Sequence, residues 1–200
     1  AADPVVELGD PRGDDHGDGR FIYPSLGFAA GDLDAVAFRV ENEGDHAVFT
    51  VEFAGRSNKP QRGAADELGR DFTRIARHGF YQFNVDVYID TDRRTGSGHT
   101  RLLPGRLAAV APDDAWDLAV VATPRPQVIR GLLREVMQEE LVNAQRQADR
   151  KLATQQAAAF ERHVYFPRDM KVRGKRLSFS VPHALLGGEA SDRWGYTVVI

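Results

Sequence analysis

The sequence contains no cysteine, and this absence removes several classes of chemistry at once. Disulfide bonds, thiolate catalysis, cysteine-ligated zinc, iron–sulfur clusters and covalently attached c-type haem all need a thiol. Long apolar runs are missing too, because no segment approaches the roughly 18 apolar residues of a membrane span. The sequence therefore predicts a chain that does not itself span a membrane.

Neither sign of charge dominates. The sequence has 26 Lys and Arg against 29 Asp and Glu, for a formal net charge of -3. No global basic field is present to hold a nucleic-acid backbone, so no nucleic-acid partner is expected. A hydrophobic content of 42% over 200 residues suffices for a packed core, and we expect one domain over residues 1–200.

Both ends of the sequence carry an expectation. The small residues Ala1-Ala2-Asp3 are typical of what remains after signal-peptide cleavage, although a cloning boundary would look the same. The last seven residues, WGYTVVI (194–200), have strand character, which suggests that the natural protein continues beyond Ile200.

Short strand-like runs separated by turn residues recur along the chain. In NVDVYI, Val85, Val87 and Ile89 alternate with Asp86 and Tyr88, which predicts a strand with one buried face. This pattern favours an all-β antiparallel sandwich. The expected strands lie at 36–40, 46–53, 81–89, 116–122, 176–181 and 194–200.

Residues 127–160 have a different period. They contain no Pro, and apolar residues return every three or four positions, from Ile129 and Leu133 to Leu141, Ala144, Ala148 and Leu152. The only glycine in the stretch is Gly131. We expect a long helix within an insertion over 124–166, its stripe either covering the sheet or contacting a protein partner.

The segment before residue 35 is rich in Asp and Gly. We expect an ordered loop over residues 3–34, in which DPRGDDHGDG (10–19) gathers carboxylates. Calcium takes six to eight oxygen ligands, and a glycine-rich loop bends tightly enough to supply them. Two interpretations stay open, a calcium site and a solvated turn whose Asp side chains cap local backbone groups.

A second oxygen-rich loop contains Asp90, Asp92 and the glycines Gly96 and Gly98. Arg93 and Arg94 lie inside it, and their fixed charges oppose a cation. The pattern favours a hairpin turn in which Asp90 caps backbone N–H groups.

Several motifs in order resemble the C-terminal binding module of glucodextranase, a DOMON-like β-sandwich related to family 9 carbohydrate-binding modules. They flank residues 124–170, where the long helix departs from the pattern. The motifs are DPRGDDHGDGRFIYP (10–24), GDLDAVAFRVENEGDHAVFTVEF (31–53), FNVDVYIDTDRRTGSGHTRLLPGRLA (83–108), AWDLAVV (115–121) and LSFSVPHALLGGEASDRWGYTVV (177–199).

The resemblance implies a non-catalytic, extracytoplasmic module, periplasmic, secreted or at the cell surface, that attaches to polysaccharide or cell envelope and contains structural calcium. Transferred residue by residue, the calcium site falls on Asp10, Asp14 and Asp15, with Asp34 as a candidate closing ligand.

Trp116 and Trp194 are the candidate sugar-binding residues. Tryptophan offers a large aromatic face to the C–H face of a sugar ring, and related modules hold sugar between tryptophans. The alternative for each is packing in the sandwich core or at a sheet edge.

The alternative function is an accessory subunit that docks through helix 127–160. Some DOMON-like relatives bind b-type haem through Met, His or Lys, so Met170, Lys171 and His163 leave an electron-transfer module open. The sequence shows no zinc-binding HExxH, nucleophile elbow, phosphate loop or dinucleotide fingerprint, and no enzyme is expected.

Overall fold

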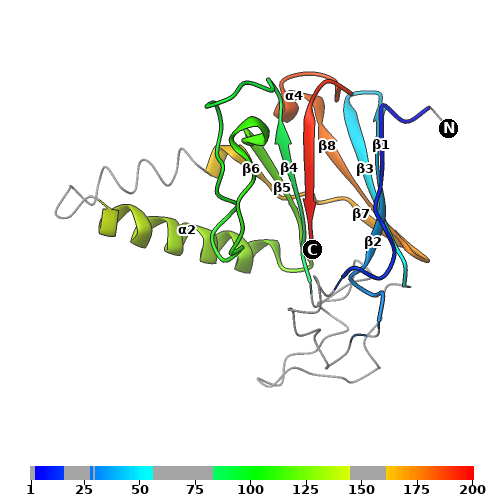
Figure 1. Cartoon of the computed structure of the whole chain (residues 1–200), viewed down its shortest axis with the longest axis horizontal. Coiled ribbons are helices and arrows are strands. Elements are labelled where there is room, and N and C mark those ends of the chain that lie inside the picture. Colours follow the sequence, from blue (N-terminus) through cyan, green and yellow to red (C-terminus); the bar gives the residue numbers. More distant parts are fainter. Residues whose placement is uncertain (1–2, 16–27, 29, 56–82, 145–160) are drawn as a thin grey trace. The chain divides into compact units, whose positions relative to one another are not determined.

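The computed structural model describes residues 3–15, 28, 30–55, 83–144 and 161–200 (Figure 1). In chain order the elements are β1 (Val6–Gly9), β2 (Ala35–Glu43), β3 (His46–Phe53), β4 (Val85–Asp90), η3 (Pro112–Asp114), β5 (Leu118–Ala122), α2 (Pro126–Ala144), η4 (Glu161–His163), β6 (Val164–Tyr165), β7 (Met170–Arg173), β8 (Arg176–Pro182), α4 (His183–Leu186) and β9 (Gly195–Val199).

The strands form two sheets, so the protein has the all-β, sandwich-like fold that the sequence predicts. Residue contacts divide the chain into two compact units, and each unit contains one sheet. One unit comprises Ala1–Val85, Pro167–Asp192 and Ile200, and the other comprises Asp86–Phe166 and Arg193–Val199. The two units are described separately below.

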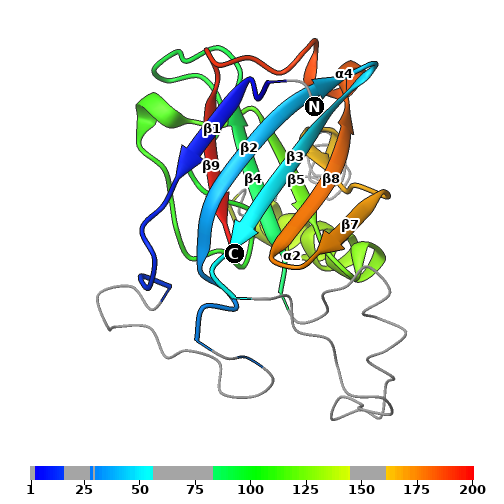
Figure 2. The same cartoon turned by 90° about the vertical axis from the view of Figure 1, so that its right-hand side faces the viewer.

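The first sheet has five strands in the order β1-β2-β3-β8-β7, and all its neighbours are antiparallel (Figure 2). Burial alternates strictly along β3, where every second residue from Ala47 to Phe53 is buried. On that face Phe49 lies 5.9 Å from Phe38 and 5.7 Å from Phe179, both ring pairs edge to face. The opposite face of the sheet therefore carries the polar side chains.

The predicted N-terminal loop over residues 3–34 begins with a strand. Val6–Gly9 form β1 and pair with Ala37–Val40 of β2. The sequence did not predict this short edge strand, since only Val6 of its four residues is buried and no apolar alternation is visible among the surrounding Asp and Gly residues.

The second sheet has four strands in the order β6-β5-β4-β9. The prediction of a purely antiparallel sandwich is wrong at one pair, since β5 and β6 are parallel. Parallel neighbours need a crossover connection, and the segment between Ala122 and Val164, which contains α2, supplies it.

Strand β4 is buried on both faces, whereas its alternation predicted one buried face. Asp86 is 2% exposed and Tyr88 is 1% exposed. The loop after β4 covers both side chains. The ring centroids of Trp116 and Tyr88 are 5.3 Å apart, and Arg106 forms an ion pair with Asp86.

The prediction of a single long helix is not supported. Helix α2 has 19 residues and ends at Ala144, and residues 161–165 at the end of the predicted insertion form η4 and β6. The part of the prediction over 145–160 lies outside the described residues. The first apolar residues of the predicted stripe do pack in the core of the unit that contains the four-stranded sheet. There Leu133 is buried with Phe166, and Ile129 packs beside them.

Candidate functional site

The outward face of the five-stranded sheet carries mostly polar side chains. In a sheet, residues directly opposite one another point to the same side. The register therefore brings five side chains into one row across all five strands: Glu7, Arg39, Thr50, Ser178 and Lys171.

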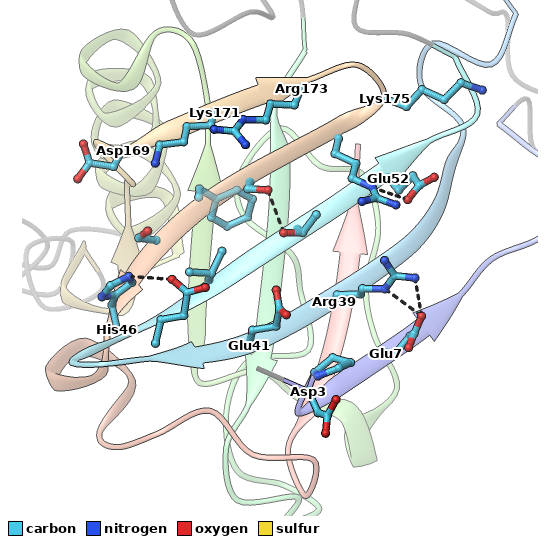
Figure 3. Close-up of a pocket in the computed structure, with 18 residues that line it drawn as sticks. Asp3, Glu7, Arg39, Glu41, His46, Glu52, Asp169, Lys171, Arg173 and Lys175 are labelled. Carbon is cyan, nitrogen blue, oxygen red and sulfur yellow. Dashed lines mark hydrogen bonds and ion pairs between the residues drawn. The ribbon is translucent and has the colours of Figure 1, made fainter. Parts of the chain in front are cut away.

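This face is hollowed into a groove of about 1020 Å³. Figure 3 shows its floor, made by strands of the one sheet. The groove is lined by Asp3, Pro4, Glu7, Arg39, Glu41, Glu43, His46, Val48, Thr50, Glu52, Asp169, Lys171, Arg173, Lys175, Arg176, Ser178, Phe179 and Ser180. This volume is at the upper end of what small-molecule pockets occupy, about 300–1,000 Å³, so the groove can hold a ligand of several rings.

Hydroxyl groups occupy the middle of the groove. The Oγ1 of Thr50 and the Oγ of Ser178 share a hydrogen bond of 2.9 Å, and both residues are half-buried. Each hydroxyl has one donor hydrogen and two acceptor lone pairs, so capacity for further hydrogen bonds remains. The floor can therefore both donate to and accept from a polar ligand.

Ion pairs hold two of the groove's arginines. An Nη of Arg39 lies 2.7 Å from Oε1 of Glu7, and Nε of Arg176 lies 2.8 Å from Oε2 of Glu52. The carboxylate of Glu7 raises the pKa of Arg39 by hydrogen bonding and by its charge. These pairs connect neighbouring strands and fix the side chains that frame the hydroxyl row.

Sequence reasoning did not identify this groove. The signal that was available is the alternation of polar residues in the strands, such as Arg39 and Glu41 or Ser178 and Ser180. That signal places polar side chains on the solvent face of each strand. It does not reveal that β8 lies between β3 and β7, which is what joins the separate rows into one surface.

The predicted calcium residues lie around the start of β2. Asp34 is 3% exposed, and its Oδ2 accepts a hydrogen bond of 2.8 Å from the backbone N–H of Gly13. Its Oδ1 is buried and, within the described part of the chain, has no hydrogen-bond partner. An unpaired buried carboxylate oxygen is costly, so this atom fits a cation ligand.

The structure brings Asp14 and Asp34 into electrostatic reach of Asp10. Partial desolvation raises the pKa of the Asp10 carboxyl, and the negative charges of Asp14 and Asp34 raise it further. Asp15 is turned to another contact, since its Oδ2 accepts a hydrogen bond of 3.3 Å from the N–H of Gly31. Mutual repulsion among these carboxylates is the electrostatic condition that a divalent cation relieves.

A tighter carboxylate group lies elsewhere. Among the described residues, Asp90, Asp92 and Asp117 are the one set of three whose ligand atoms all lie within 4.8 Å of one another. One or both oxygens of each carboxylate already accept hydrogen bonds from N–H or hydroxyl donors. Oδ2 of Asp117 accepts from the backbone N–H of Thr91 at 2.9 Å and from its hydroxyl at 2.7 Å.

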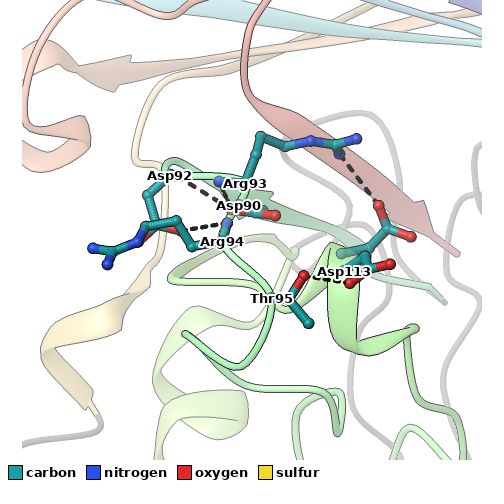
Figure 4. Close-up of polar contacts among 7 residues, drawn as sticks. Asp90, Asp92, Arg93, Arg94, Thr95 and Asp113 are labelled. Atoms are coloured by element: carbon teal, nitrogen blue, oxygen red, sulfur yellow. Dashed lines mark hydrogen bonds and ion pairs between the residues drawn. The ribbon is translucent and has the colours of Figure 1, made fainter.

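The turn after β4 confirms the capping interpretation of Asp90. Its Oδ1 accepts from the backbone N–H groups of Asp92 at 3.2 Å and Arg93 at 2.7 Å (Figure 4). Asp92 in turn accepts from the N–H of Arg94 at 2.9 Å. These carboxylates satisfy backbone donors in a tight turn.

Comparison with protein families decides the relationship. A family model described as the C-terminal binding module, SLH-like, of glucodextranase matches residues 5–200. The chain belongs to this family. A search of curated protein sequences found no significant match.

Family membership makes the positions of the two tryptophans informative. Trp116 is 1% exposed, and its Nε1 donates a hydrogen bond of 3.0 Å to the carbonyl of Arg101. It packs against Tyr88 and His99 in the core of the four-stranded sheet's unit. Because Trp116 has no exposed ring face, its place in the structure matches the packing alternative and leaves no surface on which a sugar could stack.

Trp194 directly precedes edge strand β9 and is half-buried. Its ring centroid is 6.5 Å from that of Tyr196, with the planes tilted by 38°. This aromatic pair remains a candidate sugar contact, separate from the groove.

The residues of the haem alternative have other roles here. Met170 is 8% exposed in β7, and Lys171, the next residue along the strand, lies on the opposite face. The Nδ1 of His163 is 3.1 Å from the carbonyl oxygen of Asp117. The haem alternative stays an untested prediction.

Two other expectations concern helix α2. Val128 is 50% exposed and Leu132 is 51% exposed, while the stripe residues Ala148 and Leu152 lie outside the described residues, so a docking role stays a prediction. In the part of the chain that the structure describes, no helix has both the length and the apolar character needed to cross a membrane.

Proposed function

We propose that the protein is a non-catalytic, extracytoplasmic module that attaches to polysaccharide or cell envelope and binds its ligand in the groove of the five-stranded sheet. The observation that carries the proposal is this 1020 Å³ groove, whose floor presents hydroxyls between rows of charged side chains. Membership of a binding-module family supports a role in attachment.

Polysaccharide suits the chemistry of the floor. Sugar hydroxyl groups both donate and accept hydrogen bonds, and the groove offers the matching partners. Thr50, Ser178 and Ser180 supply hydroxyls, while Glu41 is a carboxylate that accepts bonds from ligand hydroxyls. Water can bridge what direct contacts do not reach, so an open polar groove binds sugar without a large apolar area.

We further propose that calcium stabilises the module through Asp34, Asp10 and Asp14, with Asp15 beside them. The buried, unpaired Oδ1 of Asp34 supports this assignment. Bound calcium would neutralise the carboxylates and hold the segment after β1 against the start of β2. Extracellular modules bind calcium with dissociation constants of about 10⁻⁴–10⁻³ M, which suits an extracytoplasmic location.

The proposal is tested by filling the groove. Ser178 points outward between Thr50 and Lys171, so Ser178→Tyr places a ring over the floor without entering the core. The control Leu107→Tyr adds the same ring at a fully exposed loop position in the other unit. Affinity electrophoresis against a polysaccharide panel and isolated cell envelope measures binding, and circular dichroism checks folding.

We expect at least one polymer of the panel to retard the wild type and the control, and Ser178→Tyr to migrate freely. Equal retardation of all three proteins would place the binding surface elsewhere, and the Trp194–Tyr196 pair would then be the next candidate. If no polymer and no envelope preparation binds the wild type, the proposed function is wrong.

A further inference from the structure

The edge strand of the groove carries cations that have no acidic partner. Lys171 and Arg173 alternate along β7 on the groove side and are exposed. Within the described residues, neither side chain has a hydrogen bond or ion pair, unlike those of Arg39 and Arg176 on the inner strands. Two residues along a strand are about 7 Å apart, so the charges form a spaced pair.

The hairpin joining β7 to β8 concentrates this charge further. Arg173 lies directly opposite Arg176 in the register. Like charges at directly opposite positions are destabilising. Glu52 compensates Arg176 alone, and Lys175 in the connecting turn donates its ammonium hydrogen to the carbonyl of Ala54. This hairpin brings four cations to the groove lining, and the acids next to it are Asp169 and Glu52, so the edge keeps a net positive charge.

The opposite side of the groove has the reverse charge. Glu41 and Glu43 lie on β2, three strand intervals from β7, which at about 4.8 Å per interval is about 14 Å. Figure 3 shows Lys171 and Arg173 along one side and Glu41 on the strand near the other. A chain that is anionic along its whole length would be repelled by the acidic side.

A ligand that matches both sides needs isolated acid groups and neutral hydroxyls. Arg and Lys pair with a carboxylate through charge-assisted hydrogen bonds, and the guanidinium fork of Arg fits it with two parallel bonds. Hydroxyls on the rest of the ligand donate to Glu41 and exchange hydrogen bonds with Thr50 and Ser178.

We propose that the groove recognises a carboxylated polysaccharide, and that Lys171 and Arg173 bind its carboxylate groups. This inference rests on the proposed function, because it names the ligand class of the same groove. Lys171 and Arg173 determine specificity, and the hydroxyl floor and Glu41 contact the neutral part of the chain.

A pair of polymers tests the charge requirement on one backbone. Partly methyl-esterified polygalacturonate carries isolated carboxylates among uncharged sugars, and its fully methyl-esterified form keeps the sugars and removes the charge. Dextran provides a neutral polymer, polyphosphate provides phosphate charge without sugar, and duplex DNA provides a nucleic-acid polyanion. Isothermal titration calorimetry with the full chain measures each affinity at low and at high salt.

The test variant is Lys171→Gln/Arg173→Gln. Its matched control is Arg101→Gln/Arg162→Gln, which also removes two positive charges, but from exposed positions in the other unit. We expect the partly esterified polymer to bind at least tenfold more tightly than the fully esterified one. The test variant should lose that preference, the control should keep it, and added salt should weaken it.

The outcomes distinguish a failure of the carboxylate inference from a failure of the proposed function. If dextran or the fully esterified polymer binds as well as the partly esterified one and Lys171→Gln/Arg173→Gln changes nothing, the inference is overturned while the proposed function stands. Preferential binding of polyphosphate or DNA also overturns the carboxylate assignment. If no saccharide polymer and no cell-envelope preparation binds at all, the proposed function fails with it.

Discussion

Arg106 donates two hydrogen bonds to Asp86, one from Nε to Oδ2 and one of 3.0 Å from Nη2 to Oδ1. Both side chains are largely removed from solvent, at 17% and 3% exposure. The same carboxylate accepts a hydrogen bond from the hydroxyl of Tyr88 at 3.2 Å. This contact attaches the loop after β4 to the face of the four-stranded sheet that carries Asp86 and Tyr88.

Breaking this pair should destabilise the fold strongly. Asp86→Asn leaves the Arg106 guanidinium without its buried counter-charge, and removing one partner of a buried pair costs about 3–5 kcal/mol. Urea unfolding measures the loss. The comparison is Glu52→Gln, which breaks the more exposed pair with Arg176 and should cost less than about 1 kcal/mol. Equal losses in the two variants would show that the Asp86 pair does not anchor the loop.

A glycine pair separates steric contact from backbone strain. Gly98 has a φ of 74°, and an added Cβ would lie 2.7 Å from the carbonyl oxygen of Trp116. Gly96 has a similar φ of 84° but open space around its Cβ position. Both alanine variants suffer the strain of a positive φ, about 1 kcal/mol or more. Gly98→Ala should lose clearly more unfolding free energy than Gly96→Ala, and equal losses would argue against close packing of this loop on Trp116.

His99 should make stability fall on acidification. Desolvation of its ring lowers the pKa of His99, and the nearby His163 lowers it further, against an opposing contribution from Asp117. The folded-state pKa therefore lies below the ordinary value of 6.5. Between these two values the unfolded chain binds more protons, so stability is fully present above 6.5 and is lost as the pH falls.

Urea midpoints measured from pH 7.5 down to pH 5 test this sign. His99→Gln should flatten the decline. His163→Gln should flatten it less, because desolvation, the larger cause, remains. A decline that is unchanged in His99→Gln would assign the acid sensitivity to other groups.

Calcium removal should lower the melting temperature. When free calcium is at one hundred times the dissociation constant of the site, its binding adds about 2.7 kcal/mol to the free energy of unfolding. Asp34→Asn keeps an oxygen for the N–H of Gly13 but loses the charge, so the variant should melt at the same temperature with and without chelator. Asp192→Asn, at an exposed position, should keep the chelator response. An unchanged wild-type midpoint, with no metal in elemental analysis, would contradict the calcium proposal.

Local patterns predicted much of the fold and little of the groove. The run 46–53 has the two-residue period of a half-buried strand, and β3 occupies those residues. The same reasoning misjudged β4, because its polar face is covered by Arg106 and Trp116 from a loop far along the sequence. It also left Trp116 open as a sugar contact, since the sequence does not show that the chain near His99 folds over this ring.

The groove escaped prediction for the same reason. Thr50 and Ser178 are separated by 128 residues, and only the pairing of β3 with β8 brings their hydroxyls together. Asp34 is an intermediate case. Its type and its loop were visible in the sequence, whereas its burial and its unpaired oxygen required the structure.

The central claim is that ligand binds on the outward face of the five-stranded sheet, and amide chemical shifts test it most directly. Titrating the labelled protein with a bound polysaccharide should shift the amide signals of Thr50, Ser178 and Lys171. Signals of Trp194 and Tyr196 should stay in place. Shifts confined to Trp194 and Tyr196, with the groove strands unchanged, would contradict the account.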